Sequence, residues 1–365
     1  MIEVSDGNLF GELTERLIAR QVPLHALFEI TERCNYTCTH CYLPHRGDDE
    51  LSTDEAIGAL DSLADAGTLF LTITGGEIFL RRDFFEIAEH AKAREFVTRY
   101  FTNGWFVDEQ KADRLAALYP IGVEISLYGP DAATFEIVTQ VPGSFERTTR
   151  AIRLLTEHGL RVVAKTPIMS VNARRLEETW ELARTLGSEL KFDALVSPMD
   201  GGENAPLALR ASTEDLAHAF AFEKKLLGPG FKAPPPKPHD DAPCNAGRGA
   251  VSISPRGDVY PCVAIKISAG NLREKPFAEI WYGTDGILGR MRGITIASLE
   301  TCVTCEDRPF CPRCAGVARH EEGSLTAPSL EACRIAATRR AVLEGRPIPT
   351  EFPNRAGHRA LRILS

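Results

Sequence analysis

Residues 24–42 read LHALFEITERCNYTCTHCY, a β-rich run followed closely by three cysteines. Cys34, Cys38 and Cys41 are spaced as C-x3-C-x2-C. Thiolates in such an arrangement suit zinc or an iron–sulfur cluster, and structural sites of both kinds usually take four ligands. Three ligands leave one coordination position open, and open positions are where metal chemistry takes place. A [4Fe–4S] cluster held here would therefore present one iron without a protein thiolate.

Structural zinc is the alternative that the same residues allow, with His40 or His45 as the fourth ligand. Short Cys/His spacings are shared among metals, so the spacing alone does not exclude zinc. On that hypothesis the chain would be a zinc-stabilised binding protein without catalysis. Anaerobic purification separates the two cases, because a colourless protein with zinc and no sulfide would exclude iron–sulfur chemistry.

The sequence around this stretch predicts an α/β fold. Six β-rich runs alternate with six helical patterns, which predicts a parallel sheet in a barrel, an open barrel or a doubly wound arrangement. Ser52 has the features of a helix N-cap, and Ser144 heads a helix that closes on Gly159. The expected strands are 24–30, 69–75, 96–103, 121–129, 160–168 and 190–198.

Polar and glycine-rich positions collect where these strands end. In parallel α/β folds, functional groups gather at the carboxyl ends of the strands. The residues at those ends are Gly75, Gly76 and Glu77 after the second strand, Asn103 after the third and Ser126 on the fourth. Glycines allow a close backbone approach to a ligand, and the Glu77 carboxylate could hold an ammonium group.

A general base is left unassigned by the sequence. The residues on or near the right strands are Glu124, Tyr128, Lys165 and Asp193. Strand alternation predicts that Glu124, Ser126 and Tyr128 face the same side, which makes Tyr128 a candidate for the cavity.

Composition restricts the class of protein. The 365 residues include 42 basic and 50 acidic side chains, a formal net charge of −8, which argues against a nucleic-acid substrate. The N-terminus lacks a signal-peptide core, and no stretch approaches the roughly 18 apolar residues of a membrane span. We therefore expect a cytoplasmic protein, in which closely spaced cysteines favour metal binding over disulfides.

The C-terminal third differs from the rest. Residues 228–243 are too proline-rich for a helix or central strand and are interpreted as a linker. SISPRGDVYPC (252–262) is typical of a β-hairpin. Seven of the ten cysteines lie in a small unit with few apolar runs, where bound metal would help folding; they are Cys244, Cys262, Cys302, Cys305, Cys311, Cys314 and Cys333. A zinc ribbon is the structural alternative for its C-x2-C pairs.

C-x3-C-x2-C after the first strand and GGE after the second together resemble the radical S-adenosylmethionine (SAM) enzymes, over about residues 24–198. The resemblance implies a partial (β/α)6 barrel of the TIM type and a [4Fe–4S] cluster on Cys34, Cys38 and Cys41. In that family the open iron binds SAM, whose reductive cleavage gives a 5′-deoxyadenosyl radical that removes a hydrogen atom from the substrate. The expected SAM-binding residues are Gly75, Gly76, Glu77, Asn103 and Ser126.

Two positions depart from the family pattern. Ile78 occupies the place after GGE where a proline is common, and Thr139 lies near the point where many relatives carry an arginine that reaches the cofactor. We therefore assign no arginine to the SAM site. The changed residue after GGE is expected to alter the loop but not the chemistry.

The C-terminal cysteines resemble the SPASM extension of that family through residue 333. The resemblance implies up to two auxiliary [4Fe–4S] clusters. One would be held by Cys302, Cys305, Cys311 and Cys333, and the other by Cys244, Cys262, Cys314 and a fourth ligand that we do not identify. Only two residues separate Cys311 from Cys314 where the family usually has three, which leaves the division of ligands open.

This architecture divides the chain into an N-terminal segment (1–23), the barrel (24–227), the linker (228–243), the auxiliary-cluster domain (244–345) and a C-terminal tail (346–365). It implies an oxidoreductase that cross-links a ribosomally made peptide or oxidises one of its side chains; modification of a tetrapyrrole side chain in a haem pathway is the alternative. Because only residues 1–23 precede the barrel, we expect no appended peptide-binding domain, so a separate recognition protein would bring a leader-bearing peptide. Flavodoxin or ferredoxin would donate electrons, and neither nucleic acid nor membrane is an expected partner.

Overall fold

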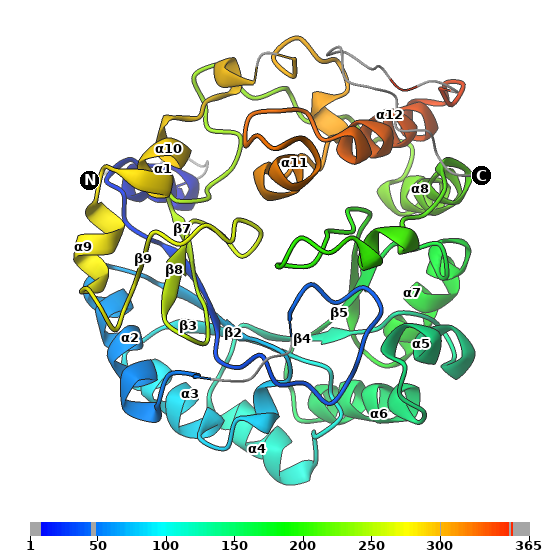
Figure 1. Cartoon of the computed structure of the whole chain (residues 1–365). Coiled ribbons are helices and arrows are strands. Elements are labelled where there is room, and N and C mark those ends of the chain that lie inside the picture. The colour runs from blue at the N-terminus through cyan, green and yellow to red at the C-terminus, as the bar shows by residue number, and fades with distance from the viewer. Residues whose placement is uncertain (1–8, 45–48, 300, 350–351, 353–365) are drawn as a thin grey trace, which may run out of the picture.

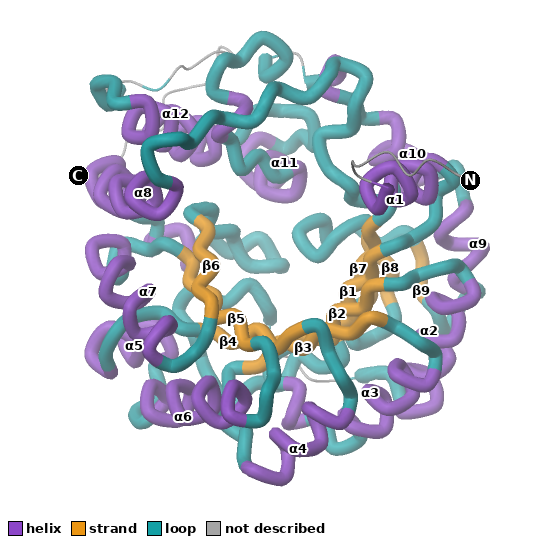
Figure 2. The backbone as a smooth tube through the Cα atoms, turned by 180° about the vertical axis from the view of Figure 1, so that it is seen from behind, coloured by secondary structure: helices purple, strands orange, loops and turns teal. Residues whose placement is uncertain are grey.

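The computed structural model of the chain describes residues 9–44, 49–299, 301–349 and 352. All six expected strands are present and pair in parallel in chain order; the first five lie within three residues of their predicted bounds, whereas the sixth ends at Asp193, five residues earlier than expected. The sheet ends at β6 on one side without closing, so it forms an open, partial barrel (Figures 1 and 2). The strands are β1 (His25–Glu29), β2 (Phe70–Thr74), β3 (Val97–Thr102), β4 (Gly122–Ser126), β5 (Val162–Pro167) and β6 (Glu189–Asp193).

Helices cover the convex side of the sheet, as Figure 1 shows for α2 to α7. Ser52 caps α2 as expected, and its partner in the capping box is Glu55. These helices are α2 (Thr53–Asp65), α3 (Phe84–Ala93), α4 (Glu109–Ala117), α5 (Ala132–Thr139), α6 (Ser144–Glu157) and α7 (Leu176–Thr185), with α8 (Thr213–Leu227) following β6.

The connection after β4 differs from the expected single helix. It holds two helices, α5 and α6, because Gln140 and Gly143 adopt positive φ angles of 59° and 77° and Pro142 between them has no N–H to donate. Gly143, and not Ser144, is the N-cap of α6. The Ser144 hydroxyl instead lies 2.7 Å from that of Thr139.

The expected hairpin in residues 252–262 is present, formed by β7 (Ala250–Ile253) and β8 (Asp258–Tyr260). The sequence did not predict that β7 pairs in parallel with β1, so that the cysteine-rich unit continues the sheet of the barrel. The remaining elements are β9 (Gly270–Asn271), α1 (Leu9–Ala19), α9 (Phe277–Tyr282), α10 (Gly286–Gly293), α11 (Ala315–Glu322), α12 (Leu330–Glu344) and the short 3-10 helices Ile78–Leu80, Ala173–Arg175, Ala205–Leu209, Ile296–Ser298 and Arg308–Phe310.

The cysteine-rich unit also packs against the far end of the barrel. Ile335 of α12 shares a hydrophobic cluster with Leu216 and Phe220 of α8, and Arg339 pairs with Glu223. Residues 228–243, between the two, contain no helix or strand. Figure 2 shows the arc of strands with α8, α11 and α12 on its open side.

The two faces of the sheet differ in character. Phe28, Ile73 and Ile125 are fully buried in the core beneath the helices. The alternate positions of the same region point to the concave face, and they include the charged residues Arg99, Glu124 and Lys165. Among the described residues, no helix is long and apolar enough to cross a membrane.

Candidate active site

The three N-terminal cysteines lie in an irregular loop at the carboxyl edge of β1. Backbone hydrogen bonds tie this loop to α5, from Thr37 N to Thr139 O (3.3 Å) and from Thr39 N to Val138 O (2.9 Å). The pKa of the Cys41 thiol is raised to about 11, chiefly by burial, with a smaller contribution from the neighbouring Cys34. Partly buried thiols that disfavour one another as thiolates are stabilised by a positively charged metal centre, so the donor set fits an iron–sulfur cluster.

The zinc alternative uses the same three cysteines, with His40 or His45 as the fourth ligand. A zinc ion needs its ligands about 2.0–2.3 Å from one point. Within residues 9–44, 49–299, 301–349 and 352, no group of three or more His, Cys, Asp or Glu side chains could hold one metal ion. His40 lies in this range, whereas His45 lies outside the described residues.

Gly75 and Gly76 are required by the packing of the cysteine loop against the end of β2. A Cβ atom on Gly75 would lie 2.3 Å from Thr31 O, and one on Gly76 would lie 2.3 Å from Arg33 O. Gly75 also has a φ of 150°, which favours glycine. The close backbone approach that the sequence suggested therefore exists, but its partner in the structure is the segment that leads into the cysteines; contact of these glycines with SAM stays a prediction.

Glu77 is fully buried and holds the ends of β2 and β3 together. Its carboxylate accepts hydrogen bonds from Thr102 Oγ1 (2.8 Å), Asn103 N (2.8 Å) and Phe79 N (3.2 Å). Burial raises its pKa to about 7, although these three donors favour the charged form. In this structure the carboxylate is occupied by backbone and hydroxyl donors, so its contact with the ammonium of SAM also stays a prediction. Thr102, immediately before Asn103, was not singled out by the sequence.

Asn103 connects β3 to the cysteine loop. Its Nδ2 donates to Asn35 Oδ1 (2.9 Å) and lies 3.8 Å from Cys34 Sγ, while its Oδ1 accepts from Trp105 N (2.9 Å). The Cys34 sulfur also accepts from Tyr36 N at 3.4 Å. Hydrogen bonds to a cluster sulfur ligand are among the factors that set its potential. Asn103, which was selected from the sequence as a polar residue after the third strand, therefore lies next to Cys34 in the structure.

Replacing Glu77 with glutamine is expected to break hydrogen bonds of the site, although the two side chains have nearly the same size and shape. The glutamine amide keeps one acceptor oxygen, but its NH2 group would face the N–H of Phe79 or of Asn103, which is also a donor. Each buried donor left without an acceptor lowers the stability of the folded protein by about 1–3 kcal/mol. We expect a lower unfolding temperature and slower SAM cleavage, measured as 5′-deoxyadenosine formed after reduction. Glu86→Gln, the same change at an exposed position of α3, is the control and should change neither. Equal behaviour of the two variants would contradict this role of Glu77.

His40 and Tyr128 cover the loop from the side of β4. Their rings meet edge to face at 4.7 Å, and Tyr128 also stacks on Phe135. Tyr128 lies beyond the last residue of β4 and belongs to the main hydrophobic core, against which Cys38 also packs. Burial lowers the pKa of His40 to about 4, and its Nδ1 is buried without a hydrogen-bond partner among the described residues.

The charged candidates for a general base all have partners. Glu124 lies 3.1 Å from Lys165 Nζ and 3.4 Å from Arg99 Nε, and Asp193 Oδ1 accepts from Leu195 N. The structure therefore places Glu124 and Lys165 together on the concave face, but it leaves neither as a free base. This assignment stays open.

A buried ion cluster near Cys41 was missed by the sequence analysis. Lys266, from the loop after β8, donates to Glu29 Oε2 (2.6 Å) and lies 3.3 Å from Asp200 Oδ2. Tyr42 donates its hydroxyl to Glu29 Oε1 (3.2 Å), and its carbonyl accepts from Asp200 N (2.8 Å). Glu29 comes from β1 and Asp200 from beyond β6, so Lys266 joins the two ends of the open barrel beside the third cysteine. No local sequence signal could have found residues that are this far apart in the chain.

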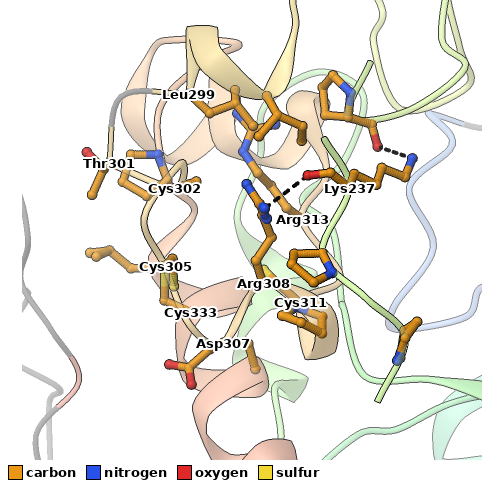
Figure 3. Close-up of a pocket in the computed structure, with 18 of the residues that line it drawn as sticks. Lys237, Leu299, Thr301, Cys302, Cys305, Asp307, Arg308, Cys311, Arg313 and Cys333 are labelled. Atoms are coloured by element: carbon orange, nitrogen blue, oxygen red, sulfur yellow. Dashed lines mark hydrogen bonds between the residues drawn. The ribbon is translucent and has the colours of Figure 1, made fainter. Parts of the chain in front are cut away.

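Four of the C-terminal cysteines surround one cavity of about 280 Å³ (Figure 3). They are Cys302, Cys305, Cys311 and Cys333, the set that the family resemblance assigned to one auxiliary cluster. Burial raises the pKa of the Cys311 thiol to about 12, and the neighbouring Cys333 adds to the rise. Four thiols in the lining of one cavity match the type and number of ligands that a [4Fe–4S] cluster takes.

The other three cysteines also come near one another. Cys262 is partly buried, and the nearby Cys314 and Cys244 disfavour its thiolate, although burial is the larger cause of its raised pKa. Gly316 allows α11 to approach this region, because a Cβ atom there would lie only 1.8 Å from Ala264 O. The ligand sets of both auxiliary clusters remain predictions, with a geometry that is consistent with them.

Comparison with known proteins agrees with this arrangement. Residues 28–186 match the model of the radical SAM superfamily, and residues 244–314 match the SPASM model of an iron–sulfur cluster-binding domain. A PqqA peptide cyclase of Xanthomonas euvesicatoria pv. vesicatoria is 30% identical over 88% of this chain and 91% of its own length. An AdoMet-dependent heme synthase of Methanosarcina barkeri is 28% identical over 79% of this chain and 89% of its own.

The fold has solved counterparts as well. Native anSMEcpe with bound AdoMet and Cp18Cys peptide superposes with a TM-score of 0.67 at 15% identity, over 88% of this chain and 96% of that one. With the cysteine loop, the GGE segment and the thiol-lined cavity in place, the chain belongs to the radical SAM superfamily and carries a C-terminal SPASM domain, and it is an enzyme that uses a [4Fe–4S] cluster, auxiliary clusters and S-adenosylmethionine.

Proposed function

We propose that this enzyme oxidatively modifies a ribosomally made peptide, by forming a cross-link or oxidising a side chain. Cys34, Cys38 and Cys41 would hold a [4Fe–4S] cluster, which with SAM would supply the 5′-deoxyadenosyl radical for hydrogen abstraction. Asn103 and the N–H of Tyr36 orient Cys34, and Glu77 holds Asn103 in place. The relative with the highest identity named above is a peptide cyclase that this chain matches over most of its length.

The observation that carries the proposal is the charged concave face of the sheet. Arg99, Glu124 and Lys165 form ion pairs across β3, β4 and β5, directly within the barrel. A tetrapyrrole ring requires a broad apolar surface, whereas a peptide brings amides and polar side chains that such a face can bind. The polarity of this face therefore favours a peptide.

A tetrapyrrole in a haem pathway is the second candidate, because relatives named as heme synthases match most of this chain. We also propose that a flavodoxin or ferredoxin supplies electrons and that a separate recognition protein delivers the peptide.

The experiment is anaerobic co-expression of the full chain with candidate small peptides, followed by mass spectrometry. Loss of two hydrogens from a peptide, dependent on the enzyme, would support the proposal. In a parallel reaction the purified, reduced enzyme receives SAM and a carboxylated tetrapyrrole. A mass change of the tetrapyrrole with every peptide unchanged would contradict the proposal and support the second candidate.

A further inference from the structure

Two arginines line the cavity that contains Cys302, Cys305, Cys311 and Cys333. Arg308 donates to Lys237 O (3.0 Å) and Val303 O (3.2 Å). Arg313 donates to Leu325 O (2.6 Å) and Ala327 O (2.9 Å). The Nε atom of each arginine is buried and has no hydrogen-bond partner among the described residues. Both arginines and the four cysteines belong to the lining of the same cavity, and Figure 3 labels all six residues.

The positive charges of these arginines are not neutralised by the surrounding chain. In residues 9–44, 49–299, 301–349 and 352, neither arginine forms an ion pair with a carboxylate, since the partners named above are neutral carbonyl groups. The cavity has two acidic residues in its lining, Asp307 and Glu322. Asp307 is paired with Arg340 at 2.9 Å. Lys237, a third cation in the lining, donates to the carbonyls of Ala242 and Pro243. Three cations therefore face two acids, one of which is already paired.

The proline-rich segment covers this cavity and strengthens its electrostatics. Pro234, Pro235, Pro236 and Pro243 contribute to the lining, and the segment is held down by hydrogen bonds from Ala297 N to His239 O (2.9 Å) and from Ile296 N to Asp241 O (2.8 Å). Apolar rings exclude water, and charges interact more strongly where the local dielectric constant is low. The segment that composition identified as a linker is therefore a wall of the cavity in this structure.

We propose that Arg308 and Arg313 raise the reduction potential of the auxiliary [4Fe–4S] cluster in this cavity and so make it an electron acceptor. A reduced cluster carries one more negative charge than an oxidised one, so nearby cations stabilise the reduced state more. Net charge and hydrogen bonds to sulfur are known determinants of cluster potential. Both arginines would act through their positive charge beside the cysteine ligands of the cluster. Neither is proposed to touch the substrate, so neither is a catalytic residue.

The role of a raised reduction potential rests on the proposed function. In an oxidative peptide modification the substrate loses a hydrogen atom to the 5′-deoxyadenosyl radical and then one electron and one proton. The proton leaves to a base or to water, and the electron requires an acceptor, which the cluster beside Arg308 and Arg313 provides. The potential itself can be measured without substrate, so the result does not depend on whether the substrate is a peptide.

The test is a redox titration of the auxiliary cluster followed by electron paramagnetic resonance, with iron and sulfide content as a second readout. The parent is the full chain with its six other cysteines changed to alanine: Cys34, Cys38, Cys41, Cys244, Cys262 and Cys314. If this parent holds no iron, the arginine variants are made in the wild-type chain and titrated beside it. The resonance signal whose midpoint differs between the wild-type chain and the variants is then assigned to the auxiliary cluster in this cavity. We expect Arg308→Gln and Arg313→Gln each to shift the midpoint to more negative potential, and the double variant to shift it further.

Two control variants separate the effect of the positive charge in the cavity from other effects of substitution. Arg313→Lys keeps the charge and should stay closer to the parent than Arg313→Gln, and Arg319→Gln removes an exposed positive charge from α11 and should leave the midpoint unchanged. Unchanged midpoints in both glutamine variants would overturn the proposal, as would an equal shift in Arg313→Lys and Arg313→Gln. If Arg313→Gln fails to hold iron, Arg308→Gln decides alone, and an unchanged midpoint in that variant would overturn the proposal.

Discussion

Changing Cys34, Cys38 and Cys41 together to alanine is expected to abolish the reductive cleavage of SAM. These thiols are the donors at the carboxyl edge of β1, and without them no cluster can present an open iron there. The measurement is 5′-deoxyadenosine formed under anaerobic conditions with a chemical reductant, which should fall to the level of a reaction without enzyme. The iron content should fall by one cluster and leave the auxiliary clusters in place.

Thr37→Ala is the matched control for this prediction, because Thr37 lies in the same loop with an exposed side chain. Its backbone hydrogen bond to Thr139 is retained in the variant, so cleavage should continue near the wild-type rate. Cleavage that persists in the triple variant would show that the catalytic cluster lies elsewhere.

Changing Lys266 to methionine is expected to destabilise the protein by about 3–5 kcal/mol, the usual cost of removing one partner from a buried ion pair. Methionine preserves much of the side-chain volume, but it leaves Glu29, which is 1% exposed, and Asp200 without their cation. The measurement is the midpoint of thermal or urea unfolding under anaerobic conditions. Because Lys266 joins the ends of the open barrel beside Cys41, we also expect slower SAM cleavage.

Lys275→Met removes an exposed positive charge from the same unit and should leave the unfolding midpoint unchanged. Adding Glu29→Gln and Asp200→Asn to Lys266→Met should recover part of the lost stability, since no uncompensated charge then remains buried. If Lys266→Met unfolds at the same midpoint as Lys275→Met, the cluster around Lys266 does not stabilise the fold.

The parallel sheet and the place of the site were predictable because they follow from local patterns. Alternating β-rich and helical runs predict βα units, and the carboxyl ends of parallel strands share one edge. Asn103 illustrates this: it was selected only as a polar residue after the third strand, and in the structure its amide contacts the cysteine loop. The extra helix after β4 was missed, although Pro142 and Gly143 between α5 and α6 were local signals for a break.

The environment of each side chain was less predictable. Glu77 was expected to hold the ammonium group of SAM, which stays a prediction, and the structure adds that its oxygens accept hydrogen bonds from Thr102, Asn103 and Phe79. Strand alternation placed Tyr128 in the cavity, but β4 ends at Ser126, and the ring packs against His40 and Phe135. Alternation holds only while the backbone stays extended, and nothing local marks the residue at which a strand ends.

The sequence by itself determined the chemistry of this protein: three thiols after one strand, GGE after the next, and a second set of cysteines at spacings set by short loops. Tertiary structure alone decided what surrounds those groups. Pairing of β7 with β1, the bridge from Lys266 to Glu29 and Asp200, and the packing of the proline-rich segment against the cavity of Cys302, Cys305, Cys311 and Cys333 all join segments that are distant in the chain. Motif spacing records local chain geometry, whereas burial and charge pairing depend on how the whole chain packs, which no single segment encodes.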